Sequence, residues 1–141
     1  MKNYELFFKG KKITVMGLGL LGRGLGDIRF LAECGAHVTV TDLKNTEELA
    51  PSLSQLHDLS GIVYHLGGHD MEDFRHCDMV IKAARVPRSS PYVAEAQKHG
   101  IPVRMSADLF AELSELPVIG ITGTRGKSTT THLIAHILEA S

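Results

Sequence analysis

Residues 12–22 read Lys-Ile-Thr-Val-Met-Gly-Leu-Gly-Leu-Leu-Gly, an apolar run followed by glycines in G-x-G-x-x-G spacing. The run Lys12–Met16 is rich in β-branched residues and predicts a buried strand that ends at Gly17. A helical pattern follows the glycines and stops at Gly35, and a second β-rich run over residues 37–41 comes next. The stretch therefore predicts a strand, a glycine turn, a helix and a second strand.

Asp42 closes the second predicted strand, 20 residues after Gly22. With this acid the pattern is the fingerprint of a Rossmann-like unit, whose glycines let the backbone approach a diphosphate at a helix N-terminus. The spacing alone suggests NAD, but the same pattern occurs in domains that bind other nucleotides, so it indicates the fold more than the ligand. For Asp42 there are two interpretations, contact with a ligand or an Asx-turn at the strand end.

Strands and helices continue to alternate along the chain. The patterns predict helices over residues 46–58, 91–99 and 106–114 and strands over residues 61–65, 77–82 and 101–105. Pro102 favours an edge position for the last of these strands. Such alternation implies a parallel sheet with right-handed crossovers and ligands at its carboxyl edge. We expect an α/β fold, with a Rossmann-like parallel five-stranded sheet and helices on both faces, over residues 1–105.

A second glycine loop lies near the end of the sequence, where residues 120–129 read Gly-Ile-Thr-Gly-Thr-Arg-Gly-Lys-Ser-Thr. A strand is predicted before it, over residues 116–121, and a helix after it, over residues 128–140, which is the setting of a P-loop. Ile121 stands where the general pattern has its first glycine. A tight loop with a threonine as helix N-cap is the alternative interpretation.

The P-loop interpretation predicts a site for ATP and Mg²⁺. Lys127 would contact the terminal phosphates as the catalytic residue, and the Ser128 hydroxyl would be a Mg²⁺ ligand. The residues expected to bind the ATP phosphates are Gly123, Thr124, Arg125, Gly126, Lys127, Ser128 and Thr129.

The position of this loop predicts a domain boundary near Met105. Residues 106–141 would be a linker helix followed by the first strand, P-loop and helix of a second α/β domain. The predicted strand 116–121 has no sheet of its own, and an unpaired apolar strand is prone to association. We expect this strand to be disordered, to pair with the first sheet, or to be exchanged between chains.

The composition is that of an ordinary soluble globular protein, with 43% hydrophobic and 22% charged residues among 141 and a net charge of −1. Such a charge favours neither nucleic acid nor an anionic membrane surface as a partner. There is no apolar run of membrane-spanning length and no signal-peptide core, so a cytoplasmic location is expected. Cys34 and Cys77 lack C-x-x-C spacing and are expected to be reduced thiols.

Two groups of histidines resemble metal ligands without matching a known spacing. His65, His69 and His76 with Cys77 fit neither a zinc knuckle nor a helical pair. The pair His132 and His136 has i, i+4 spacing but lacks the glutamate of a metalloprotease helix, since residue 133 is Leu. Neither group is predicted to bind a metal.

The order of the two glycine loops resembles the Mur ligases of peptidoglycan synthesis, and within them the members that add D-glutamate. The resemblance covers the whole chain and is carried by residues 17–22, Asp42, residues 86–91, Asp108-Leu-Phe110 and residues 120–129. It implies that the first domain binds the UDP part of a sugar nucleotide rather than NAD. The residues expected to bind the UDP-sugar are Gly17, Gly19, Leu20, Leu21, Gly22, Asp42, Leu43, Lys44 and Arg85.

In that family the second domain binds MgATP. The resemblance implies that ATP phosphorylates the carboxylate of UDP-N-acetylmuramoyl-L-alanine and that the amine of D-glutamate then attacks the acyl phosphate. Because the sequence ends one helix past the phosphate loop, we expect the 141-residue chain not to catalyse this ligation alone.

The chain departs from the family at two positions of the first site. Leu21 stands where a Thr is common, so one hydrogen bond to substrate is expected to be absent. Arg85 stands where the family has a Gly, and it could either block the uridine pocket or supply a phosphate contact. An NAD(P)-binding oxidoreductase domain and a non-catalytic nucleotide-binding module remain the competing interpretations.

Overall fold

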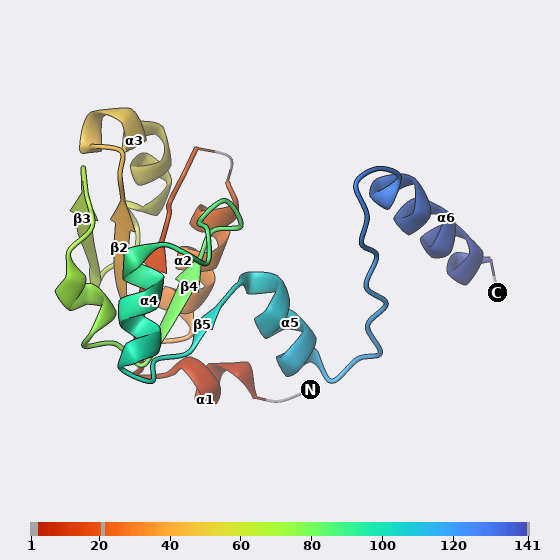
Figure 1. The fold of residues 1–141 in the computed structure, drawn as a ribbon, viewed down its shortest axis with the longest axis horizontal. Helices are drawn as coiled ribbons and strands as arrows, with labels where there is room; N and C mark the ends of the chain where they lie inside the picture. The colour runs from red at the N-terminus through yellow and green to blue at the C-terminus, as the bar shows by residue number, and fades with distance from the viewer. Residues whose placement is uncertain (1–2, 21, 141) are drawn as a thin grey trace.

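The computed structural model describes residues 3–20 and 22–140. Five parallel strands form one sheet in the order β3-β2-β1-β4-β5 (Figure 1). The strands are β1 (Lys12–Met16), β2 (His37–Asp42), β3 (Ile62–Leu66), β4 (Met79–Lys82) and β5 (Val103–Arg104). The order reverses direction between β1 and β4, which is the point where open parallel sheets bind ligands.

The helices follow the strands in alternation, as the sequence pattern predicts. They are α1 (Tyr4–Phe8), α2 (Arg23–Glu33), α3 (Thr46–Leu53), α4 (Pro91–Lys98), α5 (Ser106–Ser114) and α6 (Lys127–Glu139), with 3-10 turns η1 (Ser54–Leu56) and η2 (Met71–Phe74). No helix within the described ranges is both long enough and apolar enough to cross a membrane.

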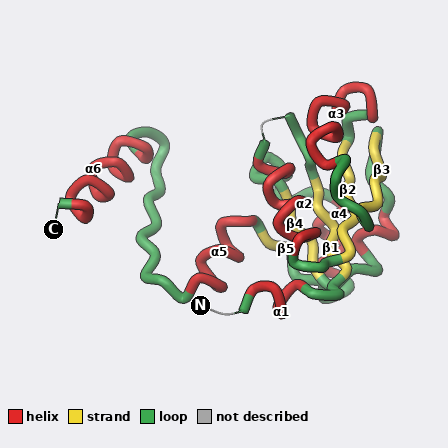
Figure 2. Tube along the Cα trace, turned by 180° about the vertical axis from the view of Figure 1, so that it is seen from behind, coloured by secondary structure: helices red, strands yellow, loops and turns green. Residues whose placement is uncertain are grey.

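Helices cover both faces of the sheet (Figure 2), because each strand alternates its side chains between two cores. On one face Val15 and Val40 pack with residues of α1, α2, α3 and α5, including Ile28 of α2. On the other face Val80 packs with Phe74 of η2 and with residues of α4. The predicted five-stranded Rossmann-like fold is confirmed.

Two predicted boundaries differ from the structure. The helix predicted over residues 46–58 ends at Leu53 and continues as η1. Pro51 has no N–H to donate, and its carbonyl oxygen accepts bonds from the side chains of Ser54 and Gln55, so the chain tightens there. The strand predicted over residues 101–105 is shorter, β5, and lies at the edge of the sheet as Pro102 predicts.

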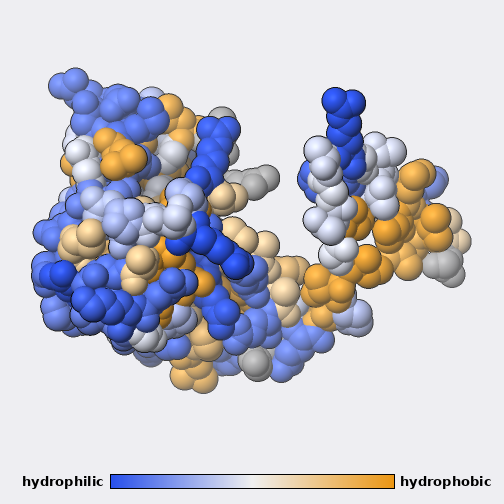
Figure 3. Space-filling model, in the orientation of Figure 1, coloured by the Kyte–Doolittle hydropathy of each residue, from blue (hydrophilic) through white to orange (hydrophobic). Residues whose placement is uncertain are grey.

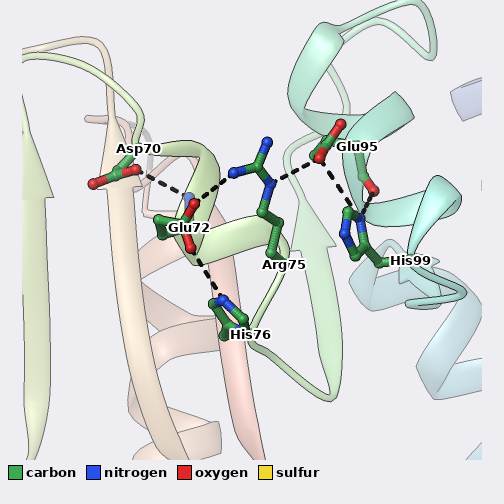
Figure 4. Close-up of polar contacts among 6 residues, drawn as sticks. All are labelled: Asp70, Glu72, Arg75, His76, Glu95 and His99. Carbon is green, nitrogen blue, oxygen red and sulfur yellow. Dashed lines mark hydrogen bonds and ion pairs between the residues drawn. The ribbon is translucent and has the colours of Figure 1, made fainter.

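A polar network joins η2 to α4 on the surface (Figure 4). Arg75 donates to Glu95 of α4 at 2.7 Å and to Glu72 at 2.5 Å. His76 pairs with Glu72 at 3.0 Å, and His99 approaches Glu95 at 3.6 Å. The hydrogen bond from Arg75 is the main reason that the pKa of Glu95 is lowered. The network fixes the connection between β3 and β4 against α4.

The chain leaves the sheet after α5 as an extended arm, residues 115–126, that leads to α6 (Figure 1). Leu116, Val118 and Ile119 of the arm are exposed, and none of the described residues of α6 is buried. Hydrophobic side chains of the arm and of α6 are visible at the surface in Figure 3.

The prediction of a strand over residues 116–121 is wrong, because these residues form neither a strand nor a bridge. A strand needs a neighbour, and the arm runs away from both edges of the sheet. Pairing with the first sheet is therefore not found, and exchange between chains remains a prediction.

Candidate nucleotide-binding sites

The first glycine loop, residues 17–22, joins β1 to α2 at the carboxyl edge of the sheet. Gly17, Gly19 and Gly22 have φ angles of 103°, 63° and 82°, which side chains other than glycine rarely adopt. Gly22 is the N-cap of α2, and no described side chain caps this helix. The first N–H groups of α2 are therefore free to bind an anion, with the helix dipole in their favour.

Neighbouring elements hold the first glycine loop in place. The N–H of Gly17 donates to the carbonyl of Thr41 at 2.8 Å. The N–H of Gly19 donates to the Asp42 carboxylate at 3.0 Å, and the Ser52 hydroxyl donates to the carbonyl of Gly19 at 2.8 Å. Because β2 and α3 both bind it, the first part of the loop, residues 17–19, is held in place before any ligand arrives.

Asp42 is 8% exposed and uses both carboxylate oxygens within the protein. Its second oxygen accepts the N–H of Lys44 at 2.9 Å, so the Asx-turn predicted as one of two roles for Asp42 is present. The carboxylate therefore ties the end of β2 to the glycine loop. Each oxygen retains a further lone pair with which a ribose hydroxyl could bond.

The residues around Asp42 give the edge its apolar character. Leu43 is 71% exposed and Leu20 of the glycine loop is 52% exposed. The Lys44 ammonium forms an ion pair with Glu48 of α3 at 3.2 Å, so its charge already has a partner within the protein. The predicted contact of Leu21 lies outside the described residues.

His69 supports this edge from the other face of the sheet, a role that the sequence pattern does not reveal. Its Nδ1 is hydrogen bonded to the hydroxyl of Thr41, and its ring packs edge-on against Tyr92 at 4.8 Å. Burial lowers the pKa of His69, while the carboxylates of Asp42 and Asp73 oppose the shift. His69 thus links the end of β2 to α4. The described residues contain no group of three potential metal ligands.

Gly24 also has a structural role that the glycine pattern of residues 17–22 does not indicate. A Cβ at this position would meet the backbone oxygens of Leu18 and Gly17, the latter at 2.6 Å. Close packing of the helix on the loop, the task of the third glycine in the fingerprint, therefore falls to Gly24, while Gly22 forms the turn. The signal in the sequence is the pair of glycines in Gly22-Arg-Gly24.

The turn after β4 forms the opposite wall of the same edge. Ala83 donates its N–H to the carbonyl of Met16 at 2.9 Å, and a Cβ on Gly17 would lie 3.0 Å from Ala83 Cβ. The Lys82 ammonium donates to the carbonyl of Val86 at 2.9 Å and so closes the turn. Arg85 is exposed on this turn. These segments all follow the carboxyl ends of strands β1, β2 and β4, which are neighbours in the sheet, so they lie at one edge.

The second glycine loop precedes α6. Gly123 and Gly126 have φ angles of 149° and 78°, and the Lys127 ammonium donates to the carbonyl of Gly123 at 2.5 Å. Gly126 is the N-cap of α6, and no described side chain caps this helix, so the interpretation with a threonine cap is wrong. Residues 123–129 are all exposed, which leaves Ser128 and the first N–H groups of α6 accessible.

A comparison with known proteins identifies the family. Residues 11–105 match the family model described as Mur ligase MurD-like, N-terminal domain. The chain belongs to the MurD-like Mur ligases. The resemblance drawn from the two glycine loops is therefore confirmed.

Curated Mur ligases match almost the whole chain. The UDP-N-acetylmuramoylalanine–D-glutamate ligase of Treponema pallidum is 38% identical over 141 residues, and that of a Roseiflexus species is 43% identical over 130 residues. These matches cover 99% and 92% of this chain but only 26% and 28% of the relatives. The chain thus spans about a quarter of the length of these Mur ligases.

Solved Mur ligase structures share the fold. The UDP-N-acetylmuramate:L-alanyl-gamma-D-glutamyl-meso-diaminopimelate ligase from Neisseria meningitides has a TM-score of 0.60 at 27% identity, over 92% of this chain and 40% of that one. The UDP-N-acetylmuramate-alanine ligase from Thermotoga maritima has a TM-score of 0.55 at 26% identity, over 92% and 29%. A shikimate dehydrogenase from Mycobacterium tuberculosis matches with a TM-score of 0.50 at 14% identity, over 81% and 56%, a likeness of fold alone.

Proposed function

We propose that this chain is the N-terminal, UDP-sugar-binding part of an ATP-dependent ligase that adds D-glutamate to UDP-N-acetylmuramoyl-L-alanine through an acyl phosphate. The single observation that carries the proposal is the uncapped N-terminus of α2 next to the anchored residues Gly17 and Gly19, in a chain of the MurD-like family. Such a helix end binds phosphate through its N–H groups and its dipole.

The proposed sugar-nucleotide site uses the residues gathered at the carboxyl edge. The diphosphate would lie on the glycine loop and the start of α2. The uracil would pack on the exposed side chains of Leu20 and Leu43, which give a planar base an apolar surface, and the ribose would bond to Asp42. Leu21 and Lys44 are neighbours of these residues in the sequence, and Arg85 lies on the turn after β4, the strand beside β1.

The proposed ATP site is the loop of residues 123–129. Bound MgATP would supply the phosphoryl group and the cation that offsets its charge. The Lys127 ammonium, now bonded to Gly123, would turn to the terminal phosphates, and the Ser128 hydroxyl would ligate Mg²⁺. D-Glutamate would be the second substrate. We expect the 141-residue chain to bind nucleotides without ligating them.

Calorimetric titration of the purified chain tests this proposal. We expect heat of binding with UDP-N-acetylmuramoyl-L-alanine and with UDP, and none with NAD. Lys127→Ala should abolish any MgATP binding and leave UDP binding unchanged, which provides a matched control within the same chain. Tight NAD binding without a response to uridine nucleotides would instead support the oxidoreductase alternative. ADP release that depends on UDP-N-acetylmuramoyl-L-alanine would contradict the expected inactivity.

A further inference from the structure

The turn between β4 and α4 carries positive charge beside the first glycine loop. Residues 79–94 contain Lys82, Arg85 and Arg88 and no Asp or Glu. Lys82 is the last residue of β4, and the two arginines follow it. The glycine loop follows the carboxyl end of β1, and β1 and β4 are adjacent. The charge therefore lies on one wall of the switch-point edge, and the uncapped N-terminus of α2 lies beside the other.

The three cations differ in their engagement. Lys82 is bonded to the carbonyl of Val86 and shapes the turn. Arg85 and Arg88 are exposed, and neither guanidinium has an ion pair or hydrogen bond with any described residue. Two arginine side chains are therefore available to a ligand.

Both arginines occupy central positions of two consecutive β-turns. The N–H of Val86 donates to the carbonyl of Ala83 at 3.0 Å, and the N–H of Ser90 donates to the carbonyl of Pro87 at 3.1 Å. Arg85 is the third residue of the first turn and Arg88 the second residue of the next. Both arginines are exposed at these central turn positions, and Pro87 restricts the backbone between them.

Resting on the proposed sugar-nucleotide site, we propose that Arg85 and Arg88 form a clamp that binds the diphosphate opposite the N-terminus of α2. A guanidinium matches two oxygens of a phosphate at once, and a lysine cannot do this. The clamp makes the site selective for nucleoside diphosphates over monophosphates. Of the two alternatives for Arg85, contact with phosphate is thereby chosen over blockage of the pocket.

Titrations of the whole chain with UDP, UMP and uridine test the clamp. Arg85→Gln and Arg88→Gln should each weaken UDP binding by about tenfold, the equivalent of one charged hydrogen bond. The loss for UMP should be smaller, and uridine binding should not change. The matched control is Lys98→Gln, which removes one charge from the last turn of α4, at the end of that helix far from the turn of Arg85 and Arg88. It should bind UDP as the unaltered chain does.

Two further measurements separate the clamp from a change in folding or in general charge. Arg85→Lys keeps the charge but loses the guanidinium group that can bind two phosphate oxygens at once. The affinity of this variant for UDP should lie between those of the unaltered chain and Arg85→Gln. Added salt should weaken UDP binding more steeply in the unaltered chain than in either glutamine variant. Thermal unfolding should be the same in all variants, since both side chains are exposed.

The outcomes distinguish this inference from the function on which it rests. If the chain binds UDP and both glutamine variants bind it equally well or better, the clamp is wrong and the sugar-nucleotide site stands. An equal loss in Lys98→Gln would also reject the clamp, because any positive charge would then serve. If the unaltered chain binds neither UDP nor UMP, both proposals fail.

Discussion

The Asp42 carboxylate accepts the N–H of Gly19 at 3.0 Å, so the end of β2 holds the middle of the glycine loop. Its other oxygen accepts the N–H of Lys44 at 2.9 Å. One buried side chain thus orders two segments that the proposed sugar nucleotide would contact.

Asp42→Asn should destabilise the fold and weaken UDP binding. An asparagine has one side-chain oxygen for two N–H donors, and its NH₂ group would face the other donor. We expect a loss of about 1–2 kcal/mol in the free energy of unfolding, measured with urea. Asp70→Asn is the control, because Asp70 accepts a single N–H, from Glu72, that an asparagine oxygen can also accept. Unchanged stability of Asp42→Asn would show that the Gly19 contact contributes nothing.

Gly24→Ala and Gly26→Ala should have opposite effects, although both add one methyl group to α2. At Gly24 the methyl would collide with backbone oxygens of the glycine loop, so we expect a loss of about 1–3 kcal/mol or more. At Gly26 a Cβ would meet nothing within 4 Å, so the better helix propensity of alanine should add about 0.5–1 kcal/mol. Thermal and urea unfolding measure both effects, and equal stability of the two variants would reject this account of α2.

Removal of residues 115–141 should leave the folded sheet intact. The described residues of α6 have no buried side chain, and both cores are built from residues before the arm. We expect the free energy of unfolding to change by no more than about 0.5 kcal/mol.

Trypsin should cut the whole chain first at Arg125 or Lys127, which are exposed.

The same truncation tests exchange of the arm between chains. If arms are exchanged, the whole chain should show a concentration-dependent dimer by light scattering, and the truncated chain should remain a monomer. A monomer in both cases would reject exchange, and a dimer in both would place the interface elsewhere.

Asp58→Asn should change the acid dependence of stability. Hydrogen bonds from Arg29 lower the pKa of Asp58 to about 2. Because the folded-state pKa is below the unfolded value of about 3.9, the stabilisation is complete above about pH 5 and is lost progressively as pH falls toward the folded-state pKa of about 2. The difference in urea midpoint between the unaltered chain and Asp58→Asn should be constant from pH 7 to about pH 5 and then shrink.

Glu139→Gln, on the exposed α6, is the control for this experiment. The difference in urea midpoint between Glu139→Gln and the unaltered chain should not shrink at low pH. If the Asp58→Asn difference stays constant down to pH 2, the pair with Arg29 is not the cause of the depressed pKa.

Most of the fold follows from local patterns in the sequence. Runs such as Lys12–Met16 bury alternate side chains on two faces, and glycines end the elements where a positive φ is needed. The segment 116–121 has an equally apolar pattern but forms no strand, because apolar composition does not supply a neighbouring strand. Strand formation depends on pairing, and a local pattern cannot report it.

The sequence predicts which segments meet at the candidate site, but not the contacts that hold these segments there. The fingerprint predicts that Gly17 and Asp42 lie at one edge, but not that Asp42 bonds to Gly19. The contact of His69 with Thr41 joins residues far apart in the sequence, and no motif marks it. The positions of ligand-contacting atoms remain predictions.

The bond from Lys127 to the carbonyl of Gly123 gives the second loop an internal competitor. At the proposed ATP site a nucleotide would have to displace the ammonium from Gly123 before it could gain the same charge, so binding would exchange one partner of Lys127 for another. The apparent affinity is then the difference between two lysine contacts, and the measured enthalpy should be smaller than a direct count of new phosphate contacts suggests.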